Sequence, residues 1–119
     1  MRAIAEHTAA AFEAQVDFAF RRNYPPLINH EQETAFAIKV MQSIVGVDQV
    51  DTRVEPTMGA EDFAYMLEAK QGAYIMLGTR RSGKDNPMLH HPAFDFNDAV
   101  LSTGAAYWAT LVEQELALA

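Results

Sequence analysis

Two consecutive prolines, Pro25 and Pro26, divide this chain of 119 residues into two unequal parts. Each proline fixes φ and lacks a backbone N–H, so neither a helix nor a sheet ladder continues through the pair. The shorter part, residues 1–23, holds one predicted helix and one alternating segment, Val16–Phe20, that favours a half-buried strand. One helix and one strand cannot bury their own apolar faces. This part must therefore pack on the rest of the chain or on structure outside it.

The longer part alternates predicted helices with short apolar segments. Asn29 is the expected N-cap of a helix that ends at Gly46, because its side chain can accept a free N–H of the first turn. A short helix is predicted over 61–69 and a long one over 98–118, with Trp108 in the core. A strand is predicted near 50–54 and another over 73–77, where a continuous apolar run fits a central strand covered on both faces.

Composition excludes several classes of function. Apolar residues make up 50% of the chain and charged residues 21%, as in a folded globular protein. The net charge of −7 disfavours nucleic acid and anionic membranes as partners, because both attract Lys and Arg. The chain has no Cys, which excludes disulfides, thiolate zinc sites and thiol nucleophiles within it. The N-terminus does not resemble a signal peptide, and no apolar run is long enough to cross a bilayer. A soluble, cytoplasmic protein is expected.

Two short motifs contain the residues that could carry chemistry. His90 and His91 end a long polar loop, and imidazole is the commonest neutral metal ligand. Adjacent side chains usually point apart, so at most one of the two binds a given metal, and a solvated pair of histidines is the alternative. Glu61 and Asp62 begin a helix, where acidic side chains stabilise the helix dipole. Alternatively, the neighbouring Gly59 allows the backbone to approach a ligand closely.

Five blocks of sequence, taken in order, resemble one enzyme family. They are Asn23-Tyr24-Pro25-Pro26-Leu27-Ile28-Asn29, Pro56–Leu67, Gly72-Ala73-Tyr74 with Leu77-Gly78, Leu89–Asp98, and Gly104–Trp108. The family is that of the M20-type dimetal amidohydrolases, which includes aminoacylases and hippurate hydrolases and is grouped with the zinc exopeptidases. The resemblance covers essentially the whole chain. Its most specific parts are Met-Gly-Ala-Glu-Asp-Phe and the block that contains His90.

The resemblance implies an α/β fold made of two incomplete domains. Residues 1–23 resemble the last helix and strand of an α+β lid and dimerisation domain. Residues 24–119 resemble the C-terminal part of a zinc-exopeptidase-like catalytic domain. The implied partners are a second copy, paired through the lid, or a missing N-terminal half of the enzyme.

The resemblance also assigns roles to individual residues. The His of the Leu-His-x-Pro block is a metal ligand in the family, which maps to His90. Gly59, Ala60 and Glu61 map to the border of the substrate pocket. The family's other ligands and its general base lie upstream and have no counterpart here, so no catalytic residue is assigned. The implied cofactor of the complete enzyme is a divalent metal: zinc, manganese, cobalt or nickel.

The implied activity of the complete enzyme is hydrolysis of the amide bond of N-acyl amino acids such as hippurate, by a metal-activated water. The chain alone is expected to be inactive, because one imidazole cannot replace a closed set of ligands. The alternative is a non-enzymatic oligomerisation or interaction module that pairs through the open edge of its N-terminal strand.

Overall fold

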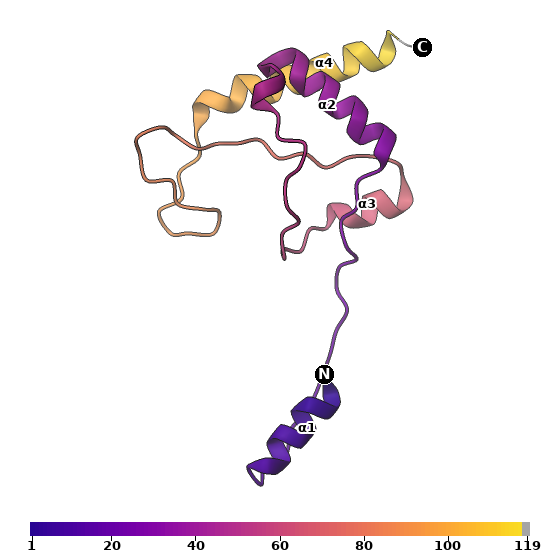
Figure 1. The fold of residues 1–119 in the computed structure, drawn as a ribbon, viewed down its shortest axis with the longest axis vertical. Coiled ribbons are helices and arrows are strands. Elements are labelled where there is room, and N and C mark those ends of the chain that lie inside the picture. Colours follow the sequence, from indigo (N-terminus) through magenta and orange to yellow (C-terminus); the bar gives the residue numbers. More distant parts are fainter. Residues whose placement is uncertain (118–119) are drawn as a thin grey trace.

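A computed structural model describes residues 1–117, which form four α-helices and two 3₁₀ turns (Figure 1). Leu118, the predicted end of the last helix, lies outside the described residues. Within residues 1–117, no helix combines the length and apolar character needed to cross a membrane. The elements are α1 (Arg2–Ala11), α2 (Glu31–Val45), η1 (Val47–Gln49), α3 (Phe63–Ala69), η2 (Asp98–Val100) and α4 (Leu101–Leu116).

The molecule is extended, with α1 at the end of a long connection that leads away from the other helices (Figure 1). Its radius of gyration is 20.6 Å and its extents are 66 × 41 × 20 Å. A compact domain of this length would have a radius of gyration of about 13–14 Å. Large apolar side chains consequently stay in contact with solvent, among them Ile4 of α1 and Phe12, which follows its end.

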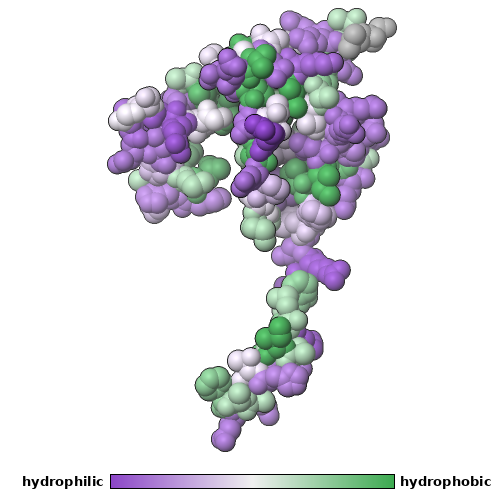
Figure 2. Space-filling view, viewed as in Figure 1, coloured by the Kyte–Doolittle hydropathy of each residue, from purple (hydrophilic) through white to green (hydrophobic). Residues whose placement is uncertain are grey.

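The core lies where α2 packs against α4. Ala37 and Val40 of α2 and Tyr107 of α4 are buried, and Val40 is fully so. Figure 2 shows apolar side chains gathered around these two helices. The C-terminal end of α2 follows the prediction. Glu31 and Glu33 occupy the first turn of the helix, and Gly46 ends it with φ +88°, a conformation that only glycine adopts readily.

The predicted N-cap of α2 is wrong by one residue. His30 occupies the cap position, and the side chain of Asn29 instead binds the backbone of Tyr74. The Tyr74 N–H donates to Asn29 Oδ1 at 2.8 Å, and Asn29 Nδ2 donates to the Tyr74 carbonyl at 2.9 Å. Next to this pair, the His30 N–H donates to the Gly72 carbonyl at 3.1 Å. Asn29 satisfies two backbone groups in this way, whereas a cap would satisfy one.

The three segments predicted as strands, 16–20, 50–54 and 73–77, have no regular secondary structure. A strand requires a partner for its backbone N–H and C=O groups, and no ladder forms within residues 1–117. Residues 72–74 are held by the side chain of Asn29 and the backbone of His30 rather than by another strand. The α/β class therefore stays a prediction.

The prediction that Trp108 lies in the core is wrong for this structure. Trp108 is 63% exposed, whereas its neighbour Tyr107 is 8% exposed. The two rings meet edge to face, with centroids 5.1 Å apart. α4 turns Tyr107 toward the core, and the side of α4 that carries Leu101, Trp108 and Val112 is exposed.

Replacing Tyr107 or Trp108 with alanine should distinguish the buried face of α4 from its exposed face. We expect Tyr107→Ala to lower the free energy of unfolding by roughly 3 kcal/mol or more, since it removes a buried ring. Trp108→Ala should lower it by less than about 1 kcal/mol, as for other exposed positions. Urea unfolding followed by circular dichroism at 222 nm measures both. Equal losses for the two variants would contradict the exposed position of Trp108.

A second prediction concerns the side chain of Asn29. Asn29→Ala removes two hydrogen bonds to Tyr74 and leaves a half-buried backbone N–H and C=O without these partners, so we expect a loss of about 1–3 kcal/mol. Asn29→Asp keeps the acceptor and loses the donor, and should fall between the wild type and the alanine variant. Urea unfolding measures the loss, and amide exchange at Tyr74 locates it. An unchanged exchange rate at Tyr74 would show that the pairing is not populated in solution.

Candidate functional site

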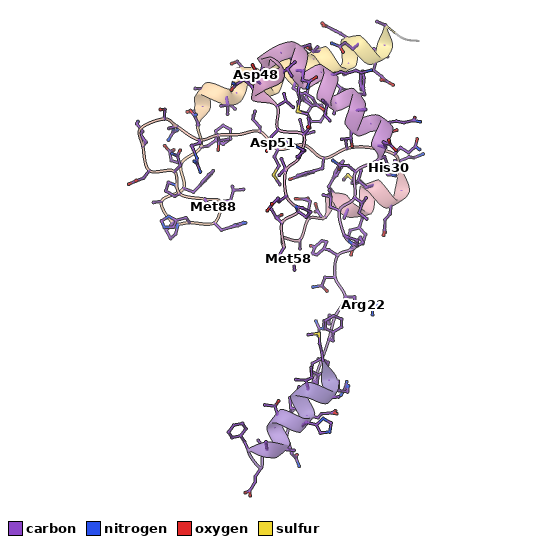
Figure 3. The ribbon with its side chains drawn as sticks, in the orientation of Figure 1. Arg22, His30, Asp48, Asp51, Met58 and Met88 are labelled. Carbon is purple, nitrogen blue, oxygen red and sulfur yellow. The ribbon has the colours of Figure 1, made fainter. Side chains whose placement is uncertain are left out.

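The sequence-predicted site residues lie on two loops. Gly59 and Ala60 are exposed in the loop that precedes α3, and His90 is exposed in the loop that precedes η2. Met58 and Met88, which stand close to these positions in the sequence, mark the two loops, and the loops are separate (Figure 3). The structure therefore does not bring His90 together with the predicted substrate-binding residues.

His90 occupies a strained position in a tight turn. The N–H of His91 donates to the Met88 carbonyl at 3.1 Å, which closes a turn with His90 at its third position. The φ angle of His90 is +71°, where glycine or asparagine is normally found. Holding a non-glycine residue in this conformation costs about 1–3 kcal/mol of conformational free energy, and the conformation persists only where the surroundings enforce it. The turn leaves the His90 side chain in contact with solvent.

Within residues 1–117, the imidazole of His90 makes no hydrogen bond, in contrast to those of His91 and His30, and the exposed ring of His7 likewise makes none. His91 Nδ1 accepts the N–H of Ala93 at 3.1 Å, and His30 Nδ1 lies 3.2 Å from the Gly72 nitrogen. No hydrogen bond or ion pair of the His90 ring is found in residues 1–117. An exposed imidazole with both nitrogens open has the donor chemistry of a metal ligand. The choice of His90 over His91 as a metal ligand stays a prediction.

The part of the chain that the structure describes holds no group of three or more His, Asp or Glu residues arranged to bind a metal ion. A closed zinc site takes four ligands, and a catalytic one takes three from the protein. His90 fits the role of one such ligand. The remaining donors would have to come from other polypeptide.

Glu61 stabilises the start of α3. Its Oε1 accepts the N–H of Phe63 at 3.1 Å, and its Oε2 accepts the hydroxyl of Tyr74 at 3.3 Å. The hydrogen bond from Phe63 is the main cause that lowers the pKa of Glu61, and one from Asp62 adds to it. Burial, followed by the charge of Glu61, raises the pKa of Tyr74. Glu61 thus binds the backbone at the start of α3, which begins at Phe63, while both the helix-dipole interpretation of Glu61 and its contact with substrate stay predictions.

A groove between α2 and α4 contains none of the predicted site residues. Two carboxylates lie among its apolar side chains. Its lining residues are Glu33, Phe36, Ala37, Gly72, Ala73, Tyr107, Trp108, Leu111 and Glu115.

Sequence reasoning did not identify Arg81, which fastens the loop that carries His90. Arg81 Nη1 pairs with Asp95 Oδ2 at 2.6 Å, and Arg81 Nη2 donates to the Phe96 carbonyl. Asn86 Oδ1 accepts the N–H of Arg81 at 2.6 Å. Asn86 Nδ2 donates to the carbonyls of Arg81 and Lys84 at 2.9 and 2.7 Å. The sequence shows only a polar loop here, because no local pattern specifies which acceptor a loop arginine reaches.

The pKa of Glu61 gives a pH-dependent prediction. A lowered pKa in the folded state means that Glu61 adds stability above its unfolded pKa, about 4.3, and that this stability is lost as pH falls through the lowered value. The amide of Phe63 should therefore shift during an NMR titration with a midpoint below the ordinary glutamate pKa. Glu61→Gln should abolish this shift. A midpoint at or above the ordinary value would contradict the hydrogen bond from Phe63.

Comparison with known proteins connects the chain to one family. Residues 4–114 match the model described as peptidase family M20/M25/M40. The chain is 30% identical over 106 residues to the amidohydrolase YhaA of Bacillus subtilis, which covers 88% of this chain and 26% of YhaA. It is 31% identical over 102 residues to a hydrolase of Synechocystis, covering 85% of this chain and 26% of that protein.

A third relative is N-acetyldiaminopimelate deacetylase of Streptococcus pneumoniae, 29% identical over 119 residues, 98% of this chain and 30% of the deacetylase. The chain thus spans less than a third of the length of each of these three relatives. No solved structure matches it significantly. The family match extends over nearly all of the chain, from the helix before the double proline to α4. The chain belongs to peptidase family M20/M25/M40.

Proposed function

We propose that this chain supplies the C-terminal part of a metal-dependent hydrolase that cleaves the amide bond of N-acyl amino acids. The observation that carries the proposal is the open imidazole of His90, held at a turn in a chain of the M20 family. One relative is named an amidohydrolase, and another is named for an N-acetylated amino acid, N-acetyldiaminopimelate. Both names describe hydrolysis at an acylated nitrogen, so the proposed substrate class follows the relatives. Hippurate is a suitable test substrate of this class.

Two loops of this chain would have different roles, one in metal binding and the other in forming the substrate pocket. His90 would hold one metal ion, which supplies Lewis acidity and lowers the pKa of a bound water when present. Gly59 and Ala60 would form one wall of the substrate pocket, where small side chains let the backbone approach closely. Glu61 would keep that wall in place by fastening the start of α3 to Tyr74.

We also propose that the other ligands and the general base come from polypeptide outside these 119 residues. Two observations support this part of the proposal. The chain spans 26% of YhaA and 30% of the deacetylase. Within residues 1–117, His90 does not meet two further His, Asp or Glu side chains. The chain alone would then lack hydrolase activity.

The second candidate function is a non-enzymatic oligomerisation or interaction module. It is favoured by α1, which contacts no other helix in the described chain, and by the exposed side chains of Ile4 in α1 and Phe12 just after it. Residues 1–23 would then pair with a second copy or another protein. This function and the hydrolase are compatible if the pairing assembles the enzyme.

A hybrid enzyme tests the proposal. Residues 4–114 replace the matching segment of YhaA, and the hybrid is compared with the 119-residue chain alone. We expect the hybrid to bind divalent metal and to release glycine from hippurate, or the free amino acid from an N-acetyl amino acid. The chain alone should do neither at a measurable rate. Metal content by mass spectrometry and amino acid release by chromatography measure both.

His90 and His91 provide the matched variants. His90→Ala in the hybrid should lower metal occupancy and abolish turnover while helix content stays unchanged, and His91→Ala should have a much smaller effect. Turnover by the chain alone would overturn its dependence on other polypeptide. Full metal occupancy in the His90→Ala hybrid would overturn the proposed role of His90.

A further inference from the structure

The loop between Gly78 and η2 has to hold His90 without help from secondary structure. Residues 79–97 contain no helix or strand, and His90 is exposed at a turn with φ +71°. The left-handed region is unfavourable for a residue with a β-carbon, and His90 keeps this conformation in a loop without helix or strand. Other contacts in this loop must therefore enforce the turn.

Arg81 is positioned to enforce it, because its side chain joins the two arms of the loop. It stands on the arm that enters the loop, and its two partners, Asp95 and Phe96, stand on the arm that leaves it. The planar guanidinium reaches a carboxylate with Nη1 and a backbone carbonyl with Nη2. A lysine can supply only a single charged point and cannot reproduce this fork.

Shorter contacts extend the restraint from Arg81 to the turn itself. Asn86 fixes the entering arm through its bonds to the backbone of Arg81 and Lys84. On the leaving arm, the N–H of Phe94 donates to the His91 carbonyl at 2.9 Å, and His91 Nδ1 accepts from Ala93. Asn86 therefore restrains the residues before His90, and the contacts of His91 restrain the residues after it. Arg81 links these two arms of the loop.

The restraint acts through geometry rather than through the strength of the ion pair. Besides its hydrogen bond to the Phe96 carbonyl, Arg81 makes an ion pair whose Asp95 side chain is 78% exposed, so water screens the charges of that pair. Its loss would hardly change global stability. The same loss would separate the two arms and let the His90 turn relax.

We propose that Arg81 is a positioning residue that presents the imidazole of His90 to a metal ion. The inference rests on the proposed function for the metal itself, but the restraint on the loop is a property of this chain alone. The nearest control is Arg80, which is exposed and makes no ion pair or side-chain hydrogen bond in residues 1–117.

The first experiment uses the 119-residue chain and its Arg81→Met, Arg81→Lys and Arg80→Met variants without metal. We expect Arg81→Met to speed amide exchange at His91 and Phe94 about tenfold and to remove the strong intraresidue NOE between the amide and Hα protons that marks a positive φ at His90. Arg81→Lys should be intermediate, and Arg80→Met should match the wild type. Helix content should stay the same in all four proteins.

The second experiment measures Zn²⁺ affinity by chelator competition in the YhaA hybrid with the same substitutions. Arg81→Met should weaken binding about 10–100-fold, the loss typical of residues that orient a metal ligand. Arg81→Lys should recover part of it. Asp95→Asn, which leaves Arg81 in place and removes only its charged partner, should change affinity in the same direction.

The two experiments separate the inference from the proposed function. If the wild-type chain lacks the positive-φ signature at His90, or if Arg81→Met leaves loop exchange unchanged, the restraint is overturned whatever the hybrid does. If the wild-type hybrid binds no Zn²⁺, the proposed function fails while the loop result stands. If the hybrid binds Zn²⁺ with equal affinity in the Arg81→Met and Arg80→Met variants, Arg81 is not a positioning residue.

Discussion

Residues 72–74 contact both the residues at the start of α2 and helix α3, so the positions of these elements depend on this segment. The Asn29 side chain and the His30 backbone hold this segment beside the start of α2. The Tyr74 ring lies 5.6 Å from Phe63 of α3, and its hydroxyl reaches Glu61. A β-carbon on Gly72 would stand 3.2 Å from the tip of buried Leu67, so a larger residue there would require Leu67 to shift by a few tenths of an ångström. The loop that carries His90 begins after Gly78, which lies four residues beyond this segment.

That arrangement fixes the local geometry, although it leaves much apolar surface exposed. Val40 is the one large side chain that is fully buried in residues 1–117, while Met76 and Leu77, in the predicted central strand, remain 67% and 44% exposed. Hydrophobic burial supplies most of the favourable free energy of folding, and a chain this extended gains little of it. YhaA and the deacetylase, of which this chain spans 26% and 30%, are more than three times as long as the chain.

Sequence patterns predicted the features that depend on neighbouring residues. The span of α2, its acidic first turn and the ending at Gly46 follow from local chemistry, as does the Asn97 side chain that accepts the Ala99 N–H before α4. The errors concern contacts between distant residues. Asn29 has good capping chemistry, yet a backbone 45 positions away offers it two bonds. Trp108 has the periodicity of a core residue, but periodicity does not say whether a partner covers that face.

The candidate site shows the same division between local and distant information. The residues around His90 resemble a known block, so sequence could identify the imidazole, but neither the turn that strains it nor the reach of Arg81 to Asp95 follows from a local pattern. A strained residue persists only where its surroundings enforce it, and here the enforcement comes from a side chain nine positions upstream. A solvated histidine pair would need no such restraint. Under the proposed function, the same restraint would hold the imidazole of His90 ready to bind a metal ion.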